Sequence, residues 1–89
     1  MAWKIDYTET ARKQLRKLDQ PTARRILNFM DARVAGQEDP RSTGKVLTGP
    51  MLGTYWRYRV GDYRIICDIQ DDALCVLVIQ VGNRSEVYR

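Results

Sequence analysis

The sequence predicts an α+β fold: an N-terminal strand, a helical hairpin and then a three-stranded antiparallel meander, in the order β-α-α-β-β-β. Two segments with helical periodicity occupy the first half of the chain, and strand-like alternation dominates residues 55–81. A Gly-Asp pair joins the first two of the later strands, as in a β-hairpin. The 89 residues suffice for a single domain spanning 1–89.

The first strand is predicted over residues 3–7. Trp3, Ile5 and Tyr7 alternate there with Lys4 and Asp6, which is the period of a strand with one buried face.

Thr8 is the expected N-cap of the first helix, which continues through Leu18 with Glu9 favourable in its first turn. Ala11, Leu15 and Leu18 form one apolar stripe at spacings i, i+4 and i+7. The cations of the two helices lie off their stripes, and we interpret them as solvated faces. The alternative is that they contact nucleic acid, such as rRNA phosphates, or an acidic partner without taking part in chemistry. These cations are Arg12, Lys13, Arg16, Lys17, Arg24 and Arg25.

The second helix is expected to begin with Pro21 at its first position and to end before Gly36. The tight joint between the two helices predicts a helical hairpin laid on the sheet. Its expected buried face consists of Ala23, Ile26, Leu27, Met30 and Val34.

Residues 37–51 are predicted to form a loop, in which the apolar stretch 45–47 anchors the segment. Strands follow at 55–60, 63–70 and 74–81, and the last of them is apolar enough to be covered on both faces. Cys67 and Cys75 fall inside these strands, so we expect buried, reduced thiols rather than a disulfide or a metal site.

The hairpin at residues 55–64 gathers arginines on one face. Strand periodicity places Tyr55, Arg57 and Arg59 together, and a two-residue loop sets Arg59 opposite Arg64 and Arg57 opposite Ile66. Like charges directly opposite each other destabilise a sheet. We therefore interpret this face as a site for a polyanion.

The other side chains of this hairpin, and Arg64 itself, allow more than one interpretation. Trp56 and Tyr58 are expected to pack on the opposite face. Tyr55 is either a surface residue or a stacking platform for a nucleobase. Arg64 could also have a purely structural role, as the ion-pair partner of Asp68 on the same strand face. We favour a functional role because Arg59 is its expected neighbour.

The amino-acid composition limits which ligands and which reaction types are expected. The net charge of +4 and a pI near 9.3 suit a nucleic-acid partner. The chain has no histidine, and it shows no cluster of metal ligands and no glycine-rich phosphate loop, so we expect chemistry without a metal or cofactor. It also lacks a signal-peptide pattern and a long apolar run, which predicts a cytoplasmic protein without membrane contact.

Several motifs together resemble the RelE/ParE superfamily, the toxins of bacterial type II toxin–antitoxin pairs. The specific ones are Gly61-Asp62-Tyr63-Arg64, preceded by Arg57-x-Arg59, and an ending with Arg84, Val87 and Tyr88. The resemblance covers nearly the whole chain and implies the RelE-like microbial RNase fold. The supporting motifs are Thr8-Glu9-Thr10-Ala11, Leu15-x-x-Leu18 and Lys45-x-Leu47-x-Gly49.

The resemblance implies a metal-independent endoribonuclease (an mRNA interferase) of the RelE branch, which cleaves mRNA in the ribosomal A site and inhibits translation. Carried over by position, it implies Arg57, Arg64, Arg84 and Tyr88 as catalytic residues. The residues expected to bind RNA are Tyr55, Arg59 and Lys45.

Tyr55 stands where the best-known type of the family has a lysine. Tyr88 is a candidate base, if nearby cations lower its pKa, and equally a candidate for stacking on a nucleobase. Tyr55 is the second candidate for either role.

The same resemblance implies partners: a cognate RelB-type antitoxin, the ribosome with its mRNA, and operator DNA only through the antitoxin complex. Two other functions stay open at this point. One is a ParE-like inhibitor of DNA gyrase, and the other is a non-catalytic basic module that binds nucleic acid.

Overall fold

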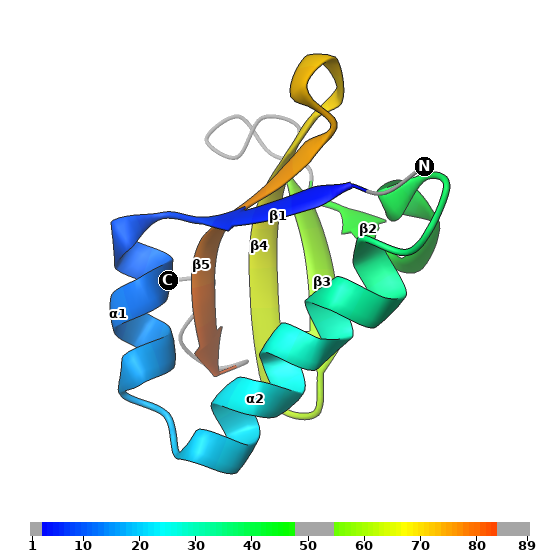
Figure 1. The fold of residues 1–89 in the computed structure, drawn as a ribbon. Coiled ribbons are helices and arrows are strands. Elements are labelled where there is room, and N and C mark those ends of the chain that lie inside the picture. The colour runs from blue at the N-terminus through cyan, green and yellow to red at the C-terminus, as the bar shows by residue number, and fades with distance from the viewer. Residues whose placement is uncertain (1–2, 48–54, 84–89) are drawn as a thin grey trace.

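The computed structural model describes residues 3–47 and 55–83 of the chain. It confirms the predicted α+β class (Figure 1). Within these ranges the chain forms two α-helices, five strands and three short helical segments of other types, η1 to η3. In chain order the elements are β1 (Lys4–Tyr7), α1 (Glu9–Arg16), α2 (Gln20–Phe29), η1 (Met30–Val34), η2 (Pro40–Thr43), β2 (Lys45–Val46), β3 (Trp56–Val60), β4 (Tyr63–Gln70), η3 (Asp71–Ala73) and β5 (Cys75–Asn83).

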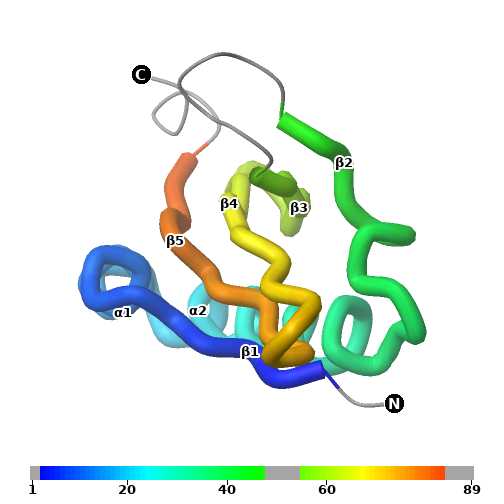
Figure 2. Tube along the Cα trace, turned by 90° about the horizontal axis from the view of Figure 1, so that it is seen from above, coloured from blue at the N-terminus to red at the C-terminus, as the bar shows by residue number. Residues whose placement is uncertain are grey.

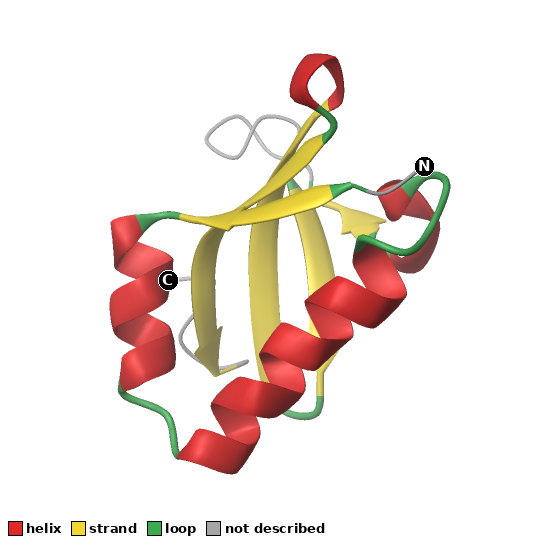
Figure 3. Ribbon diagram, in the orientation of Figure 1, coloured by secondary structure: helices red, strands yellow, loops and turns green. Residues whose placement is uncertain are grey.

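The strands form one sheet in the order β1-β5-β4-β3-β2. β1 runs parallel to β5, and the other neighbours are antiparallel. Both α-helices lie on the same side of the sheet, as the view from above shows (Figure 2). The β4–β5 hairpin extends past the end of β3, with β1 paired to this part of β5, and it ends in η3 (Figure 3).

The fifth strand corrects one expectation. Lys45 and Val46, expected to anchor a loop, pair instead with Arg57 and Trp56 as the edge strand β2. Val46 is 49% exposed, so its contribution is backbone pairing and not burial. A strand of 2 residues is too short to show strand periodicity, so its sequence does not distinguish it from a loop.

Side chains that cap both helices fix where they begin. The Thr8 hydroxyl accepts a hydrogen bond of 3.1 Å from the Ala11 amide, which confirms the predicted cap of α1. Asp19 caps α2 by accepting from the Thr22 amide at 3.1 Å. Because Asp19 is the cap, helix α2 begins at Gln20 and Pro21 occupies its second position rather than its first.

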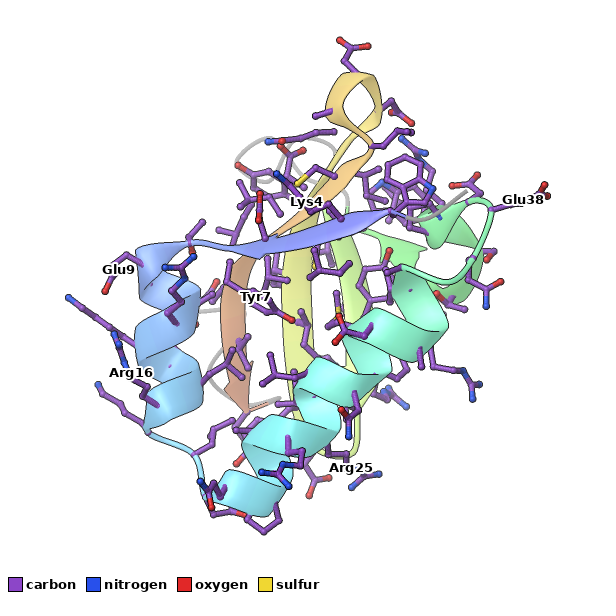
Figure 4. All side chains as sticks on the ribbon, viewed as in Figure 1. Lys4, Tyr7, Glu9, Arg16, Arg25 and Glu38 are labelled. Atoms are coloured by element: carbon purple, nitrogen blue, oxygen red, sulfur yellow. The ribbon has the colours of Figure 1, made fainter. Side chains whose placement is uncertain are left out.

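The core lies between the helices and the sheet, where Tyr7 of β1 also points (Figure 4). Leu27 corrects the predicted buried face of α2, since it is 38% exposed. It follows the fully buried Ile26 in a helix, and a step of one residue turns a side chain by about 100°. The core residues are Trp3, Ala11, Leu15, Ile26, Met30, Val34, Tyr58, Val60, Ile65, Cys67, Val76, Val78 and Val81.

The two cysteines are free and buried, as predicted. Burial raises the pKa of the Cys67 thiol, so this thiol stays protonated at neutral pH. On β5, Cys75 is buried on the face opposite the helices, whereas Val76 and Val78 are buried beneath them. This part of the strand is therefore covered on both faces.

Candidate nucleic-acid interface

The arginines of β3 and β4 meet on the sheet face that points away from the helices, which we call the open face. Tyr58 and Val60 belong to the core, and strand alternation puts Arg57 and Arg59 on the other side. The ladder pairs Arg59 with Arg64, as the sequence predicts. The remaining predicted pairs, Arg57 with Ile66 and Val60 with Tyr63, are also present.

The β3–β4 turn sets this register. Gly61 has a φ of +58°, and Leu74 is the only non-glycine residue with positive φ in the described part of the chain. Glycine at the first central position followed by a residue with negative φ is typical of a type II′ turn. That turn follows the twist of the strands, so it keeps Arg59 and Arg64 in opposition.

Two cross-strand rows bring further residues to the open face. Lys45, on the edge strand, is in register with Arg57. In the next row β5 contributes Gly82 opposite Arg64, and a glycine adds no side chain there. The structure thus brings together four of the expected site residues: Lys45, Arg57, Arg59 and Arg64.

Arg64 is the unusual member of this group. It is only 4% exposed, and its Nε atom is buried without a hydrogen-bond partner in the structure as described. The alternative pairing with Asp68 is not seen among the described residues, where Asp68 instead accepts a hydrogen bond of 3.3 Å from the side-chain Nε2 of Gln70. A buried guanidinium in this state favours an anionic ligand.

Of the three remaining expected site residues, the structure describes only Tyr55. Tyr55 is half-buried just before β3, and its carbonyl oxygen accepts a hydrogen bond of 2.8 Å from the Leu47 amide. This bond continues the pairing of β2 with β3. Arg84 and Tyr88 lie outside the described residues.

Comparison with known proteins identifies the family. The sequence profile described as "ParE toxin of type II toxin-antitoxin system, parDE" matches residues 5–88. The chain belongs to the RelE/ParE superfamily of type II toxins. This confirms the resemblance based on the arginine hairpin.

Individual RelE/ParE relatives align along nearly the whole chain. Toxin RelG of Mycobacterium tuberculosis is 29% identical over 89 residues, covering 100% of this chain and 99% of its own. The mRNA interferase toxin RelE of Escherichia coli is 32% identical over 90 residues, covering 99% and 92%.

Solved RelE structures share the fold. A chain of the toxin–antitoxin complex RelBE2 from Mycobacterium tuberculosis matches with a TM-score of 0.83 and 26% identity, covering 97% of this chain and 95% of its own. The isolated RelE toxin of Escherichia coli matches with a TM-score of 0.72 and 25% identity, covering 98% and 92%. Both confirm the RelE-like architecture predicted from the sequence.

In this RelE/ParE chain, a cluster around η2 supports the edge strand that carries Lys45. The Tyr58 hydroxyl donates a buried hydrogen bond of 2.7 Å to the Pro40 carbonyl oxygen. Arg41 lies 5.9 Å from the centre of the Trp56 ring and forms an ion pair of 2.6 Å with Asp71. No local sequence pattern indicates this role of Arg41, because its partner lies 30 residues away.

Two tyrosines of this RelE/ParE domain are unsuited to proton transfer. Burial, the largest cause, raises the pKa of both Tyr7 and Tyr58 well above the usual value of 10. Each hydroxyl therefore holds its proton at neutral pH. Both belong to the helix-covered side, whereas the arginines lie on the open face.

Residues 3–47 and 55–83 lack two other kinds of feature. No group of three or more His, Cys, Asp or Glu side chains there is placed to hold a metal ion. The helices described in these ranges also fall short of the length and hydrophobicity that a membrane-spanning helix needs.

Proposed function

We propose that this RelE/ParE toxin is a ribosome-dependent endoribonuclease that cleaves mRNA in the A site and so inhibits translation. The observation that carries the proposal is the opposition of Arg59 and Arg64 on the open face, with Arg57 beside them. The relative at 32% identity, named an mRNA interferase, supports the same reaction class.

The reaction begins with the ribose 2′-hydroxyl as nucleophile. Its oxygen forms a bond to the neighbouring phosphorus while the bond from phosphorus to the 5′-oxygen breaks. The products are a 2′,3′-cyclic phosphate and a free 5′-hydroxyl. One proton leaves the 2′-hydroxyl and another reaches the 5′-oxygen, so the step consumes no water and needs no metal.

The arginines stabilise the charge that develops on the phosphate. Guanidinium groups stay protonated and grip phosphate oxygens bidentately. Arg64 is preorganised by burial, and electrostatic stabilisation of this kind is usually the largest contribution to catalysis. Arg57 and Arg64 take the catalytic role in this proposal, with Arg84 as a third cation, while Arg59 and Lys45 bind the flanking backbone.

Proton transfer falls to a residue outside the arginine group, because arginine holds its proton at neutral pH. We assign it to Tyr88, with Tyr55 as the alternative. Because this base is weak, the cleavage rate depends on the orientation of the substrate. Holding the substrate in line lowers the reaction barrier by several kcal/mol. Binding of mRNA by the ribosome provides that orientation.

We further propose a cognate RelB-type antitoxin as the inhibitory partner. Two of the matching crystal structures are RelE–RelB complexes, from Mycobacterium tuberculosis and Pyrococcus horikoshii. An acidic or apolar antitoxin segment that covers the open face would exclude RNA. Operator DNA is then bound through the antitoxin.

Induction of the toxin without its antitoxin tests the activity. We expect growth arrest and new 5′ ends at codon positions of a translated message, absent when that message lacks its start codon. Arg64→Met keeps the volume and apolar stem of the side chain but should end both effects. Arg24→Met, on the exposed face of α2, is the matched control and should leave both unchanged.

A ParE-like action on DNA gyrase is the second candidate, because the matching family profile is that of ParE toxins. It predicts loss of supercoiling activity in purified gyrase and intact messages after induction. Messages cut in cells while gyrase keeps its activity would exclude it. A harmless toxin that still binds nucleic acid would instead support the non-catalytic module.

A further inference from the structure

The hydrogen-bonding edge of β5 changes partner along its length. β1 pairs with it from Cys75 to Val78 and ends there, with Tyr7 opposite Val78. β5 itself continues to Asn83. Its backbone groups on the β1 side beyond Val78 therefore need other partners, since unsatisfied buried N–H and C=O groups are costly.

Helix α1 and its cap supply them. The Thr8 amide donates to the Val78 carbonyl oxygen at 2.9 Å, and the Thr8 hydroxyl donates to the Ile79 carbonyl oxygen at 3.0 Å. The Val81 amide donates to Oε1 of Gln14 at 2.6 Å. A single helical side chain thus takes the place of a neighbouring strand at Val81.

These bonds flank an irregularity in the β4–β5 ladder. Ile66 pairs with Gln80 but Cys67 pairs with Val78, so Ile79 is an extra residue on β5. A bulge of this kind leaves one residue unpaired and bends its strand. The partners from α1 hold the bulged strand from the side opposite β4.

The register of β4 with β5 connects the position of Val81 to that of Arg64. Past the bulge, Ile65 pairs with Val81 and Arg64 pairs with Gly82. The contact from Gln14 is therefore one residue from the position beside Arg64. The same strand end leads in sequence to the proposed site residues Arg84 and Tyr88.

We propose that Gln14 is a positioning residue for RNA cleavage: by holding Val81, it fixes the end of β5 beside Arg64. This inference rests on the proposed ribonuclease function. Gln14 lies on the helix side of the sheet and does not contact RNA in this scheme. It acts through backbone geometry alone.

Three substitutions separate this role from a general loss of stability. Gln14→Met removes the acceptor at similar length, and Gln14→Ala removes it with the best helix former. Gln14→Glu keeps an oxygen that accepts from Val81. Gln20→Met, at the exposed first position of α2, is the matched control.

The measurements are single-turnover cleavage of mRNA on purified ribosomes and hydrogen exchange of the Val81 amide, with circular dichroism to verify folding. We expect Gln14→Met and Gln14→Ala to slow cleavage by about 10- to 100-fold, because small misplacements cost about that much. The toxin concentration at half-maximal rate should change little. Exchange at Val81 should accelerate while exchange at Ile65 stays slow.

Gln14→Glu should restore both the rate and the protection of Val81, and Gln20→Met should match the wild type. Cleavage at the wild-type rate by folded Gln14→Met, with faster exchange at Val81, would overturn the positioning role alone. A slow rate in Gln14→Glu despite a protected Val81 amide would overturn it as well. A wild-type toxin that cleaves no ribosome-bound message overturns the ribonuclease proposal and this inference together.

Discussion

Arg59 and Arg64 lie directly opposite each other in the β3–β4 ladder, although both carry a positive charge. Arg59 is exposed at the surface, whereas Arg64 is 4% exposed with a buried Nε that lacks a partner in the described structure. Opposed like charges and a buried Nε without a hydrogen-bond partner both cost folding free energy. Their presence in one pair is consistent with a site selected for binding an anion.

The first prediction follows from this repulsion. Arg59→Thr should raise the free energy of unfolding by a few tenths to about 1 kcal/mol, because a neutral strand former replaces one of two opposed cations. Urea titration at low salt measures the gain. It should shrink in 1 M salt, where charge interactions are screened. A gain that persists there would instead reflect the strand propensity of threonine.

The register of this pair was predictable because its determinants are local. Strand periodicity assigned the two faces, and the Gly61-Asp62 loop set the pairing of Arg59 with Arg64. The helix cap at Thr8 and the buried stripe around Leu15 depend equally on nearby residues.

What the sequence could not predict depends on contacts between distant segments. The pairing of Lys45 with Arg57 makes β2 a strand, and nothing within 45–46 distinguishes it from a loop. Likewise, the partner of Arg41 is Asp71, in the turn between β4 and β5. The burial of Arg64 was also unpredictable, because periodicity assigns a face and does not say what covers it.

The second prediction concerns the buried hydroxyl of Tyr58. Tyr58→Phe keeps the ring and its edge-on contact with Phe29 but leaves the Pro40 carbonyl oxygen without its donor. The free energy of unfolding should fall by about 1–3 kcal/mol, the cost of an unsatisfied buried polar group. Tyr63→Phe, on the neighbouring strand, is the control and should change it by only a few tenths. Equal losses in the two variants would contradict the assignment.

The third prediction concerns the turn. Gly61 has a φ of +58°, where an L side chain is strained, so Gly61→Ala should lower the free energy of unfolding by about 1–2 kcal/mol. Asp62→Ala serves as the control, because Asp62 is not in the positive φ region. Chemical denaturation of both variants measures the difference. A neutral Gly61→Ala would mean that the turn adopts another type at no cost.

The fourth prediction concerns the stability of the fold at low pH. Hydrogen bonds from Arg41 lower the pKa of Asp71 below its ordinary value of 3.8. A depressed pKa in the folded state gives stability that is present above the unfolded value and lost as pH falls through the folded value. Stability should therefore decline below about pH 4, and Asp71→Asn should decline less steeply. Urea midpoints at pH 7 and pH 3 test this; parallel losses in the two proteins would contradict it.

The fifth prediction concerns how RNA meets the open face. Lys45 is in register with Arg57 at the sheet edge, so it can neutralise one phosphate of a strand that crosses the face. Lys45→Gln should weaken binding of a 2′-O-methyl RNA oligonucleotide, which lacks the nucleophile and stays intact. Removal of one phosphate contact should reduce the slope of log affinity against log salt by about 0.7 for single-stranded RNA.

Lys13→Gln is the matched control for that experiment, because Lys13 is an exposed cation of α1 on the helix side of the sheet. The two variants have the same net charge, so a general electrostatic effect would weaken binding equally. If the RNA contacts the open face, the slope of log affinity against log salt should fall for Lys45→Gln and stay at the wild-type value for Lys13→Gln. The reverse result would place the RNA on the helices and remove Lys45 from the site.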